Sequence, residues 1–364
     1  MKDLRGSPGT ARKVKSSRPS AKPATEFSAI ERIRALARGP RPGLIKGIGD
    51  DCAVLKQSDR RNTVITADML IEDIDFRLEY FPPLLLGHKA LAVSLSDIAS
   101  MGARPRWAML SIGMPGGIWG SKFLDQFYEG FFELAKRHQV SLIGGDVSRT
   151  PERVVVDSIV LGETLRGQAI LRTGARPGDH IFVTGSLGGS AAGLRLLEEG
   201  RKLSRRRARS QAAMSTERLL RRHLQPEPRS EWGSLLGNKR LASAMIDLSD
   251  GLSSDLAHIC RESGVGARLD ESQLPLDESL PTVTTEPAEQ IELALNGGED
   301  FELLFTVRPR NVANLPRQLD GVRIHEIGKI TADPSEMTIA GNNGKARVLR
   351  PRGYQHFGQN NLRR

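Results

Sequence analysis

Apolar residues recur along this chain with two alternating periods, which predicts a mixed protein of strands and helices. Short runs rich in β-branched residues are typical of strands, and they occur at 54–55, 63–67, 107–112, 140–143, 154–161, 181–184, 244–246, 301–307 and 322–330. Amphipathic stretches are typical of helices, and they occur at 25–38, 84–101, 119–138, from 190 onward, 214–223 and 252–260. Because strands and helices alternate in two halves, we expect an α/β or α+β fold.

The 364 residues are enough for two domains, each with its own core. Gly174, Pro177 and Gly178 interrupt the pattern between the halves. We therefore expect a first domain at 25–168 and a second at 169–364.

Basic residues are concentrated in three segments of a chain whose net charge is +10. Residues 1–22 hold seven Lys or Arg and one Asp, whereas 201–209 and 345–364 each hold six basic residues and no acid. The tail at 1–24 has little apolar content, so it is predicted to be disordered. It could serve as a transit peptide or contact a nucleic acid or an anionic lipid, although a solvated extension is the simplest interpretation.

No apolar run approaches the roughly 20 residues of a membrane span, so no membrane association is expected. The two cysteines, Cys52 and Cys260, exclude a disulfide scaffold and favour a reducing compartment. We therefore expect a cytoplasmic protein.

Seven aspartates stand in short Gly- and Ser-rich settings, at Asp50, Asp51, Asp68, Asp97, Asp146, Asp247 and Asp250. Bends with apolar residues on both sides indicate that these carboxylates point inward, where they repel one another unless cations intervene. Oxygen ligands without a Cys/His set favour Mg²⁺, which usually arrives with substrate phosphates. The pattern predicts a metal-dependent enzyme of phosphoryl transfer.

Each acidic motif also has a simpler interpretation. Gly47–Asp51 could be a surface turn, and Asp97, beside an apolar helical stripe, could be a hydrogen-bonded core residue. Asp250 or Ser249 could be the N-cap of the next helix, and Gly297–Asp300 could be a hairpin turn.

Other candidate sites are weaker. Thr184–Ser190 lacks the Gly-Lys-Ser/Thr of a phosphate loop, so we interpret it as tight strand–helix packing. His88, His138 and His258 share no spacing with other ligands, and two acids before Cys52 would raise the pKa of its thiol.

Taken in order, the motifs resemble those of the thiamine-monophosphate kinase family, within the aminoimidazole ribonucleotide synthetase superfamily. The resemblance runs from about Phe27 to Phe357 and rests on residues 47–51, 89–103, 144–146, 172–179, 246–252, 297–300 and 353–357. It implies a two-domain fold in which the N-terminal sheet forms a barrel in a homodimer and binds ATP and Mg²⁺. A C-terminal α/β sandwich would complete the cleft.

The resemblance also implies roles for individual residues. The Mg²⁺ ligands would be Asp51, Thr66, Asp68, Asp97, Asp146, Asp247 and Asp250, with Asp50 assisting. ATP would contact Gly145, Asp146, Arg172 and Ser249, and thiamine monophosphate would contact Asp75, Glu299 and Tyr354. The family commonly has His before Phe76, where this chain has Asp75.

The implied reaction transfers a phosphoryl group from ATP directly to thiamine monophosphate, as the final step of thiamine diphosphate synthesis. Its acceptor is already anionic, so no catalytic base or protein nucleophile is expected. A selenophosphate synthetase or a hydrogenase-maturation enzyme of the same superfamily is the alternative, although selenophosphate synthetases usually have an N-terminal Cys and none precedes Cys52. A nucleic-acid-binding protein would need aromatics among its basic residues, and the tail has none before Phe27. A structural protein that binds phosphate and metal is a further alternative.

Overall fold

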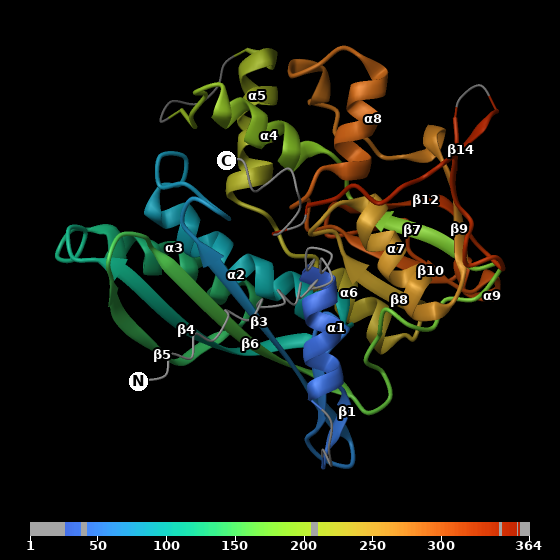
Figure 1. Cartoon of the computed structure of the whole chain (residues 1–364), viewed down its shortest axis with the longest axis horizontal. Helices are drawn as coiled ribbons and strands as arrows, with labels where there is room; N and C mark the ends of the chain where they lie inside the picture. Colours follow the sequence, from blue (N-terminus) through green and yellow to red (C-terminus); the bar gives the residue numbers. More distant parts are fainter. Residues whose placement is uncertain (1–25, 38–41, 205–209, 342–343, 355, 357–364) are drawn as a thin grey trace, which may run out of the picture.

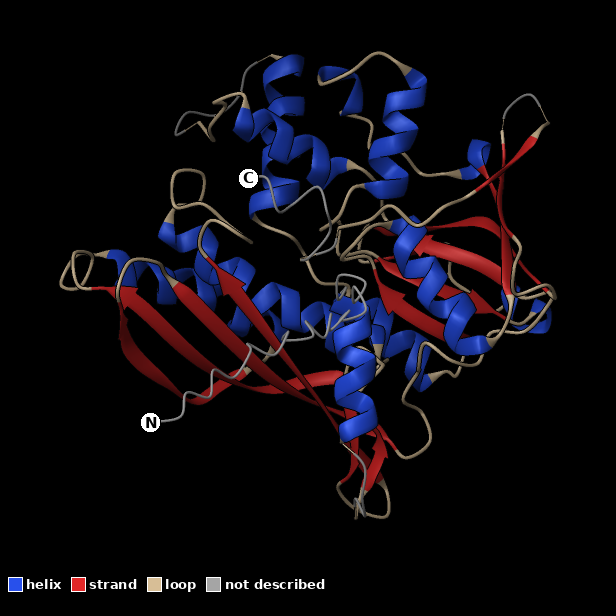
Figure 2. Cartoon of the chain, in the orientation of Figure 1, coloured by secondary structure: helices blue, strands red, loops and turns tan. Residues whose placement is uncertain are grey.

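The computed structural model describes residues 26–37, 42–204, 210–341, 344–354 and 356. Two sheets, each with its own helices, lie side by side in this part of the chain (Figures 1 and 2). The tail predicted at 1–24 lies outside the described residues. The mixed α/β class that the sequence predicts is confirmed.

The first sheet has six strands in the order β1-β2-β3-β6-β4-β5. They are β1 (Leu44–Lys46), β2 (Ala53–Lys56), β3 (Arg61–Ile71), β6 (Val155–Leu165), β4 (Arg104–Pro115) and β5 (Ser141–Thr150). Only the β4–β5 pair is parallel among these strands. Side chains alternate between a face buried under helices and an outer face, as the period of a strand requires.

Helix α2 (Pro83–Ser100) runs through the middle of the molecule. It packs against the sheet, against α3 (Phe123–His138), and against α6 (Ser230–Asn238) and β8 (Ala242–Asp247) of the second half. At Gly87 a Cβ would lie 1.8 Å from the carbonyl oxygen of Phe127, so only glycine allows the two helices to approach so closely. The helix ends before Gly102, whose φ of +66° favours glycine. Helix α1 (Glu26–Leu36) precedes the sheet.

The second sheet follows the order β14-β13-β9-β12-β7-β10-β8, with β11 paired to β12. Its strands are β7 (His180–Thr184), β8 (Ala242–Asp247), β9 (Gly266–Asp270), β10 (Leu303–Val307), β11 (Gln318–Leu319), β12 (Val322–Thr331), β13 (Met337–Ala340) and β14 (Ala346–Val348). The helices of this half are α4 (Gly189–Glu198), α5 (Gln211–Leu224), α6 (Ser230–Asn238), α7 (Leu252–Ser263), α8 (Pro287–Asn296) and α9 (Pro309–Val312), with 3₁₀ turns at Glu271–Gln273 and Leu280–Thr282.

Three local predictions are corrected. Gly144–Asp146 lies inside β5 and does not follow a strand, because β5 continues parallel to β4 through the glycines. The helix predicted from 119 begins at Phe123, after a turn. Helices α6 and α8 were not predicted, since both are short and mix apolar with small polar residues. Within the described residues, no helix has the length and apolarity to cross a bilayer.

Candidate functional site

Three of the predicted aspartates converge from separate segments of the chain. Asp51 precedes β2, Asp97 lies on α2, and Asp247 ends β8 in the second sheet. Each offers a carboxylate oxygen, and these oxygens lie within 4.8 Å of one another. Asp247 is buried and the other two are half-buried. The two halves of the molecule therefore build one acidic centre between them.

Serines of α2 bind the acidic side chains. The hydroxyl of Ser100 donates to Asp51 Oδ2 at 2.6 Å, and that of Ser96 donates to Asp247 Oδ2 at 2.6 Å. Two residues before Ser96, Ser94 donates to Asp68 Oδ2 at 2.7 Å. All three serines are fully buried. Since a buried hydroxyl requires a partner, these bonds fix where the carboxylates lie.

Thr66 extends this arrangement from β3. Its hydroxyl donates to Asp97 Oδ2. Asp68 lies two residues further along the same strand and therefore points to the same face of the sheet. The predicted ligands Thr66 and Asp68 thus lie beside the acidic centre, on the side of the sheet that α2 covers.

Burial and mutual repulsion raise the pKa values of these acids. Burial, followed by the charges of Asp68 and Asp247, raises the pKa of Asp97 well above its usual range. Burial and the charge of Asp51 raise the pKa of Asp247 to about 7, and burial raises that of Asp68 to about 6. Carboxylates in this state are stabilised by any divalent cation placed between them.

Two basic side chains lie at the edge of the centre. Arg172 donates from Nε to Asp51 Oδ1 at 2.8 Å, and its backbone N–H lies 3.2 Å from Asp50 Oδ1. The Nζ of Lys46 lies 3.1 Å from Asp50 Oδ2. Arg172, predicted to contact ATP, is thus paired with Asp51. Its contact with ATP stays a prediction.

Asp146 and Gly145 lie away from the three converging aspartates. On β5, Asp146 is opposite Ser111 of β4, whereas the buried Leu110 is opposite Gly145. Because neighbouring residues point to opposite faces, the register places the Asp146 side chain on the face opposite α2. Asp146 is exposed, and its predicted role as a metal ligand stays a prediction.

The segment between β8 and α7 corrects one sequence interpretation. The N-cap of α7 is Gly251, with φ +119°, and neither Asp250 nor Ser249 caps this helix. Instead, Asp255 from the first turn accepts from the backbone N–H of Asp250 at 3.2 Å and of Gly251 at 3.0 Å. Ligand atoms of Asp250, Asp255 and His258 lie within 4.8 Å of one another, a proximity that spacing did not predict for His258.

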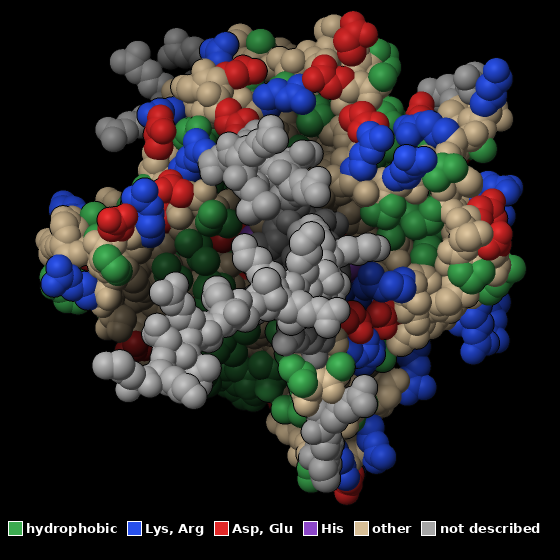
Figure 3. Space-filling model, viewed as in Figure 1, with side chains coloured by type: hydrophobic (Ala, Val, Ile, Leu, Met, Phe, Trp, Pro, Cys, Tyr) green, Lys and Arg blue, Asp and Glu red, His purple; other side chains and the backbone are tan. Residues whose placement is uncertain are grey.

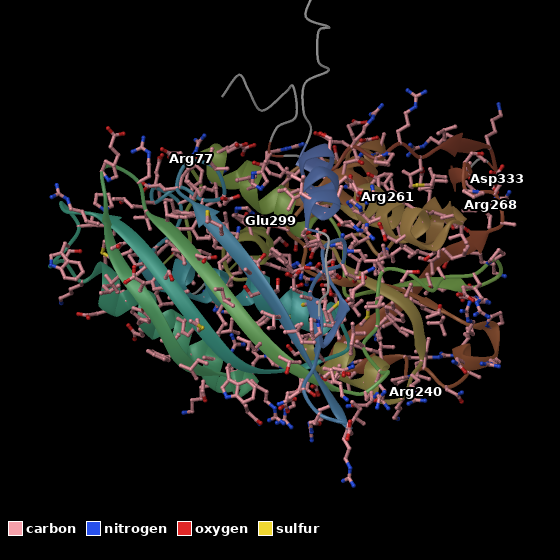
Figure 4. All side chains as sticks on the ribbon, turned by 60° about the horizontal axis from the view of Figure 1, so that its bottom comes forward. Arg77, Arg240, Arg261, Arg268, Glu299 and Asp333 are labelled. Carbon is pink, nitrogen blue, oxygen red and sulfur yellow. The ribbon has the colours of Figure 1, made fainter. Side chains whose placement is uncertain are left out.

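Figure 4 labels Glu299 in the central part of the molecule. Its carboxylate lies close to a buried lysine and a buried histidine. Its Oε1 is 2.7 Å from the Nζ of Lys89, and its Oε2 is 3.2 Å from Nδ1 of His223. The Glu299 side chain keeps 30% of its surface exposed, so it faces an accessible space.

The other predicted substrate contacts belong to the same neighbourhood. Asp75 accepts from the backbone N–H of Ile71 at 2.8 Å, and its Oδ1 lies 4.0 Å from Nε2 of His356. Burial raises the pKa of Asp75, the charge of Glu299 raises it further, and His356 opposes both. The ring of Tyr354 meets His356 edge to face with 5.0 Å between centroids.

The remaining acids of the Gly297–Glu302 segment are used inside the protein. Asp300 accepts from the backbone N–H of Gly188 at 2.7 Å and of Ser190 at 3.1 Å, at the start of α4. A side chain therefore already occupies the place where a phosphate would bind to this loop. The geometry agrees with the structural interpretation of Thr184–Ser190.

Sequence reasoning missed the serines of α2, Lys89 and His223. The available signal was a set of polar residues in an otherwise apolar helix, with Ser94 three residues and Lys89 eight residues before Asp97. The expectation for Cys52 is met, because burial, then Asp97 and Asp51, raises the pKa of its thiol well above its usual range.

Comparisons with known proteins were made against family models, curated proteins and solved structures. Residues 49–164 match the N-terminal domain of AIR synthase related proteins, and 176–340 match the C-terminal domain of the same family. These ranges correspond to the two sheets.

Curated relatives are thiamine-monophosphate kinases. That of Escherichia coli K12 is 39% identical over 91% of this chain and 98% of the relative. That of Bacillus subtilis is 37% identical over 85% of this chain and 93% of the relative.

Solved structures with the same fold include a protein described as "AaThiL complexed with AMPPCP and TMP", with a TM-score of 0.77 and 30% identity over 92% of this chain and 97% of that one. Thiamine-monophosphate kinase from Stenotrophomonas maltophilia K279a matches with a TM-score of 0.70 and 37% identity over 88% and 98%. The hydrogenase maturation protein HypE, in its complex with HypF, has a TM-score of 0.66 at 19% identity over 89% and 100%, which shows the fold alone. This chain belongs to the thiamine-monophosphate kinase family, whose members are kinases, as the resemblance in its motifs predicts.

Proposed function

We propose that this chain transfers the γ-phosphoryl group of ATP to thiamine monophosphate, giving ADP and thiamine diphosphate. The observation that carries the proposal is the convergence of Asp51, Asp97 and Asp247 within 4.8 Å, from both halves of the molecule. Two polyanionic substrates can meet at such a centre only when cations neutralise their charge. The named relatives and the neighbour bound to AMPPCP and TMP support the same reaction.

The donor set fits Mg²⁺. It consists of oxygens alone, and burial and repulsion raise the pKa of its acids, so bound divalent ions would remove that repulsion. The residues that would hold the ions are Asp51, Thr66, Asp68, Asp97 and Asp247, with Asp146 and Asp250 as further predicted ligands. When bound, Mg²⁺ supplies charge neutralisation and alignment of the phosphates.

The protein's own residues contribute to the reaction by positioning the two substrates. The acceptor oxygen of thiamine monophosphate is anionic at pH 7, so no side chain has to remove a proton from it. Arg172, with Gly145, Asp146 and Ser249, would hold ATP, and Asp75, Glu299 and Tyr354 would orient the acceptor for in-line attack. Inversion at a chiral γ-phosphorus is expected. Retention would indicate a phosphoenzyme and overturn the direct mechanism.

The decisive experiment incubates the purified protein with ATP, Mg²⁺ and thiamine monophosphate and separates the products. We expect thiamine diphosphate and ADP in equal amounts, and no product when EDTA is added. Selenide and thiamine are offered as competing acceptors. Turnover of selenide with none of thiamine monophosphate would assign the chain to the alternative chemistry.

We further propose that the chain forms a homodimer through the outer face of the first sheet. Met69 of β3, Met109 of β4 and Ile143 of β5 lie on this face, and 58%, 39% and 58% of their surface is exposed. Figure 3 shows hydrophobic side chains in a recessed area over these strands. Such an apolar face is typical of a protein interface.

Light scattering should give about twice the 39.9 kDa chain mass, and Met69→Lys should reduce the measured mass to that of one chain. A monomer in the unmodified protein would contradict the proposal.

We also propose a cytoplasmic location. Both cysteines, Cys52 and Cys260, are buried free thiols, as is typical of a reducing compartment. Fractionation of cells that produce the protein should place it with the cytoplasmic markers. Recovery with a membrane or a secreted fraction would contradict this location.

A further inference from the structure

Lys89 is an ammonium group buried in the middle of α2. Its side chain has no exposed surface, and its Nζ lies over the ring of Phe81, 5.0 Å from the centroid. The anion that faces it is Glu299, whose Oε1 is 2.7 Å away. Moving an ammonium group out of water is unfavourable by several kcal/mol unless it is paired. The ion pair with Glu299 therefore accounts for a lysine in this position.

The backbone of Glu299 is held in an uncommon conformation. Its φ of +63° lies in the left-handed region, which a residue with a side chain adopts only under constraint. Its N–H donates to the carbonyl oxygen of Ser249 at 2.8 Å, which ties it to the segment that joins Asp247 to α7. The direction of the Glu299 side chain thus depends on contacts outside its own loop.

His223 of α5 holds the second carboxylate oxygen. Its Nδ1 lies 3.2 Å from Glu299 Oε2 and 3.1 Å from the hydroxyl of Ser190. Burial and the charge of Lys89 lower the pKa of His223 to about 4, so the ring is neutral at pH 7. Burial alone would raise the pKa of Glu299, but Lys89 and His223 outweigh it, and the carboxyl stays ionised.

We propose that Lys89 is a positioning residue that fixes the carboxylate of Glu299 for the acceptor substrate, with His223 as the second anchor. The proposal rests on the proposed function, because it takes Glu299 as a contact of thiamine monophosphate. Lys89 neutralises Glu299, one of two neighbouring carboxylates, the other being Asp75. One negative charge remains, and it suits an acceptor with a cationic heteroaromatic ring such as thiazolium.

The arrangement separates acceptor binding from donor binding. Lys89 lies eight residues before Asp97 on α2, which is about 12 Å along the helix axis. Lys89 forms its ion pair with Glu299 and not with an aspartate of the acidic centre. Loss of the lysine should therefore weaken the acceptor site and leave ATP binding unaltered.

The test compares Lys89→Met, Glu299→Gln and the double variant with the unmodified protein. In Lys89→Met we expect the KM for thiamine monophosphate to rise by at least roughly tenfold while the KM for ATP changes less than about twofold. Because the lysine acts through the glutamate, the double variant should be no worse than Glu299→Gln alone. Calorimetric titration with thiamine monophosphate in the absence of ATP should show the same order of affinities.

A control variant tests whether the change in KM is specific to Lys89. Lys56, exposed and paired with Asp59 at 3.0 Å, provides the matched variant Lys56→Met, which should behave as the unmodified protein. If Lys89→Met does not fold, the double variant, which leaves no unpaired buried charge, decides by comparison with Glu299→Gln. An unchanged KM for thiamine monophosphate, equal rises for both substrates, or additive losses in the double variant would overturn the proposal. An unmodified protein that phosphorylates no thiamine monophosphate would overturn the proposed function instead.

Discussion

Two regions of this molecule hold buried acids that differ in the groups that face them. In the second domain, Glu302 accepts from Nε of Arg229 at 2.6 Å and from Nη1 of Arg222 at 3.1 Å. Burial alone would raise the pKa of Glu302, but Arg229 and Arg222 outweigh it and lower the pKa. In the acidic centre, the carboxylate of Asp97 accepts from the hydroxyl of Thr66, and its pKa is raised.

The difference indicates which acids belong to the fold and which to the chemistry. An acid paired with an arginine is already neutralised, so it has no need of an external cation. Where several acids share a site, their mutual repulsion lowers the stability of the folded protein, and a bound divalent ion restores it. Acidic side chains that face arginines and acidic side chains that face one another are thus predicted to have different roles.

The largest effect is expected from Asp97→Asn. Turnover should fall by roughly 10²–10³-fold, because one charge that holds the metal ions is lost. The Tm of the metal-free protein should stay the same or rise, since the repulsion among the acids decreases. Steady-state kinetics and thermal unfolding in EDTA measure the two quantities. A variant with a lowered Tm and normal turnover would remove the distinction between the regions.

The paired region should respond in the opposite way. Arg229→Met leaves Glu302 with an incomplete set of donors, so the free energy of unfolding should fall by about 3 kcal/mol. Unfolding in urea checks this value, and Arg310→Met on the exposed surface of α9 serves as control, with a change of at most about 0.5 kcal/mol. Equal midpoints for the two variants would show that the ion pairs of Glu302 do not stabilise the fold.

Acid should destabilise the folded protein through His223, which faces Glu299. Its pKa is about 4 in the folded protein, below the ordinary histidine value of about 6.5. Between these values the unfolded chain binds a proton that the folded chain does not, so stability falls as the pH falls. From pH 6.5 to 5.5 the loss should be about 1 kcal/mol, and His223→Asn should remove it. Parallel pH profiles for the two proteins would contradict this origin.

The smallest effect is expected from a change of Asp75, a predicted contact of the acceptor substrate. Asp75→His introduces the residue that the resemblance implies before Phe76, and it removes a negative charge from the proposed contact with the cationic ring. The KM for thiamine monophosphate should rise roughly fivefold, or about 1 kcal/mol, with kcat unaltered. Asp73→Asn is the control, because Asp73 is exposed and paired with Arg153. An equal or lower KM in Asp75→His would show that the carboxylate does not face the substrate.

The acidic motifs and the family can be identified from the sequence, because each motif is a short continuous segment with Gly and Asp. It does not predict that Asp146 lies on the opposite face of the sheet from Asp68, since this depends on strand register, which no local pattern contains. Nor does it separate Asp300 and Glu302, used internally, from Glu299, because the partners come from α4, α5 and α6. Helices α6 and α8 were missed because tertiary packing, more than periodicity, stabilises them.

Helix α2 carries both Lys89 and Asp97, so under the proposed roles one rigid element would hold the acceptor contact and the metal ligand at a fixed separation. Inserting a single residue between them would turn one group by about 100° relative to the other. Under these roles the loops around either substrate could change in length, whereas the helical segment between Lys89 and Asp97 would have to keep its length.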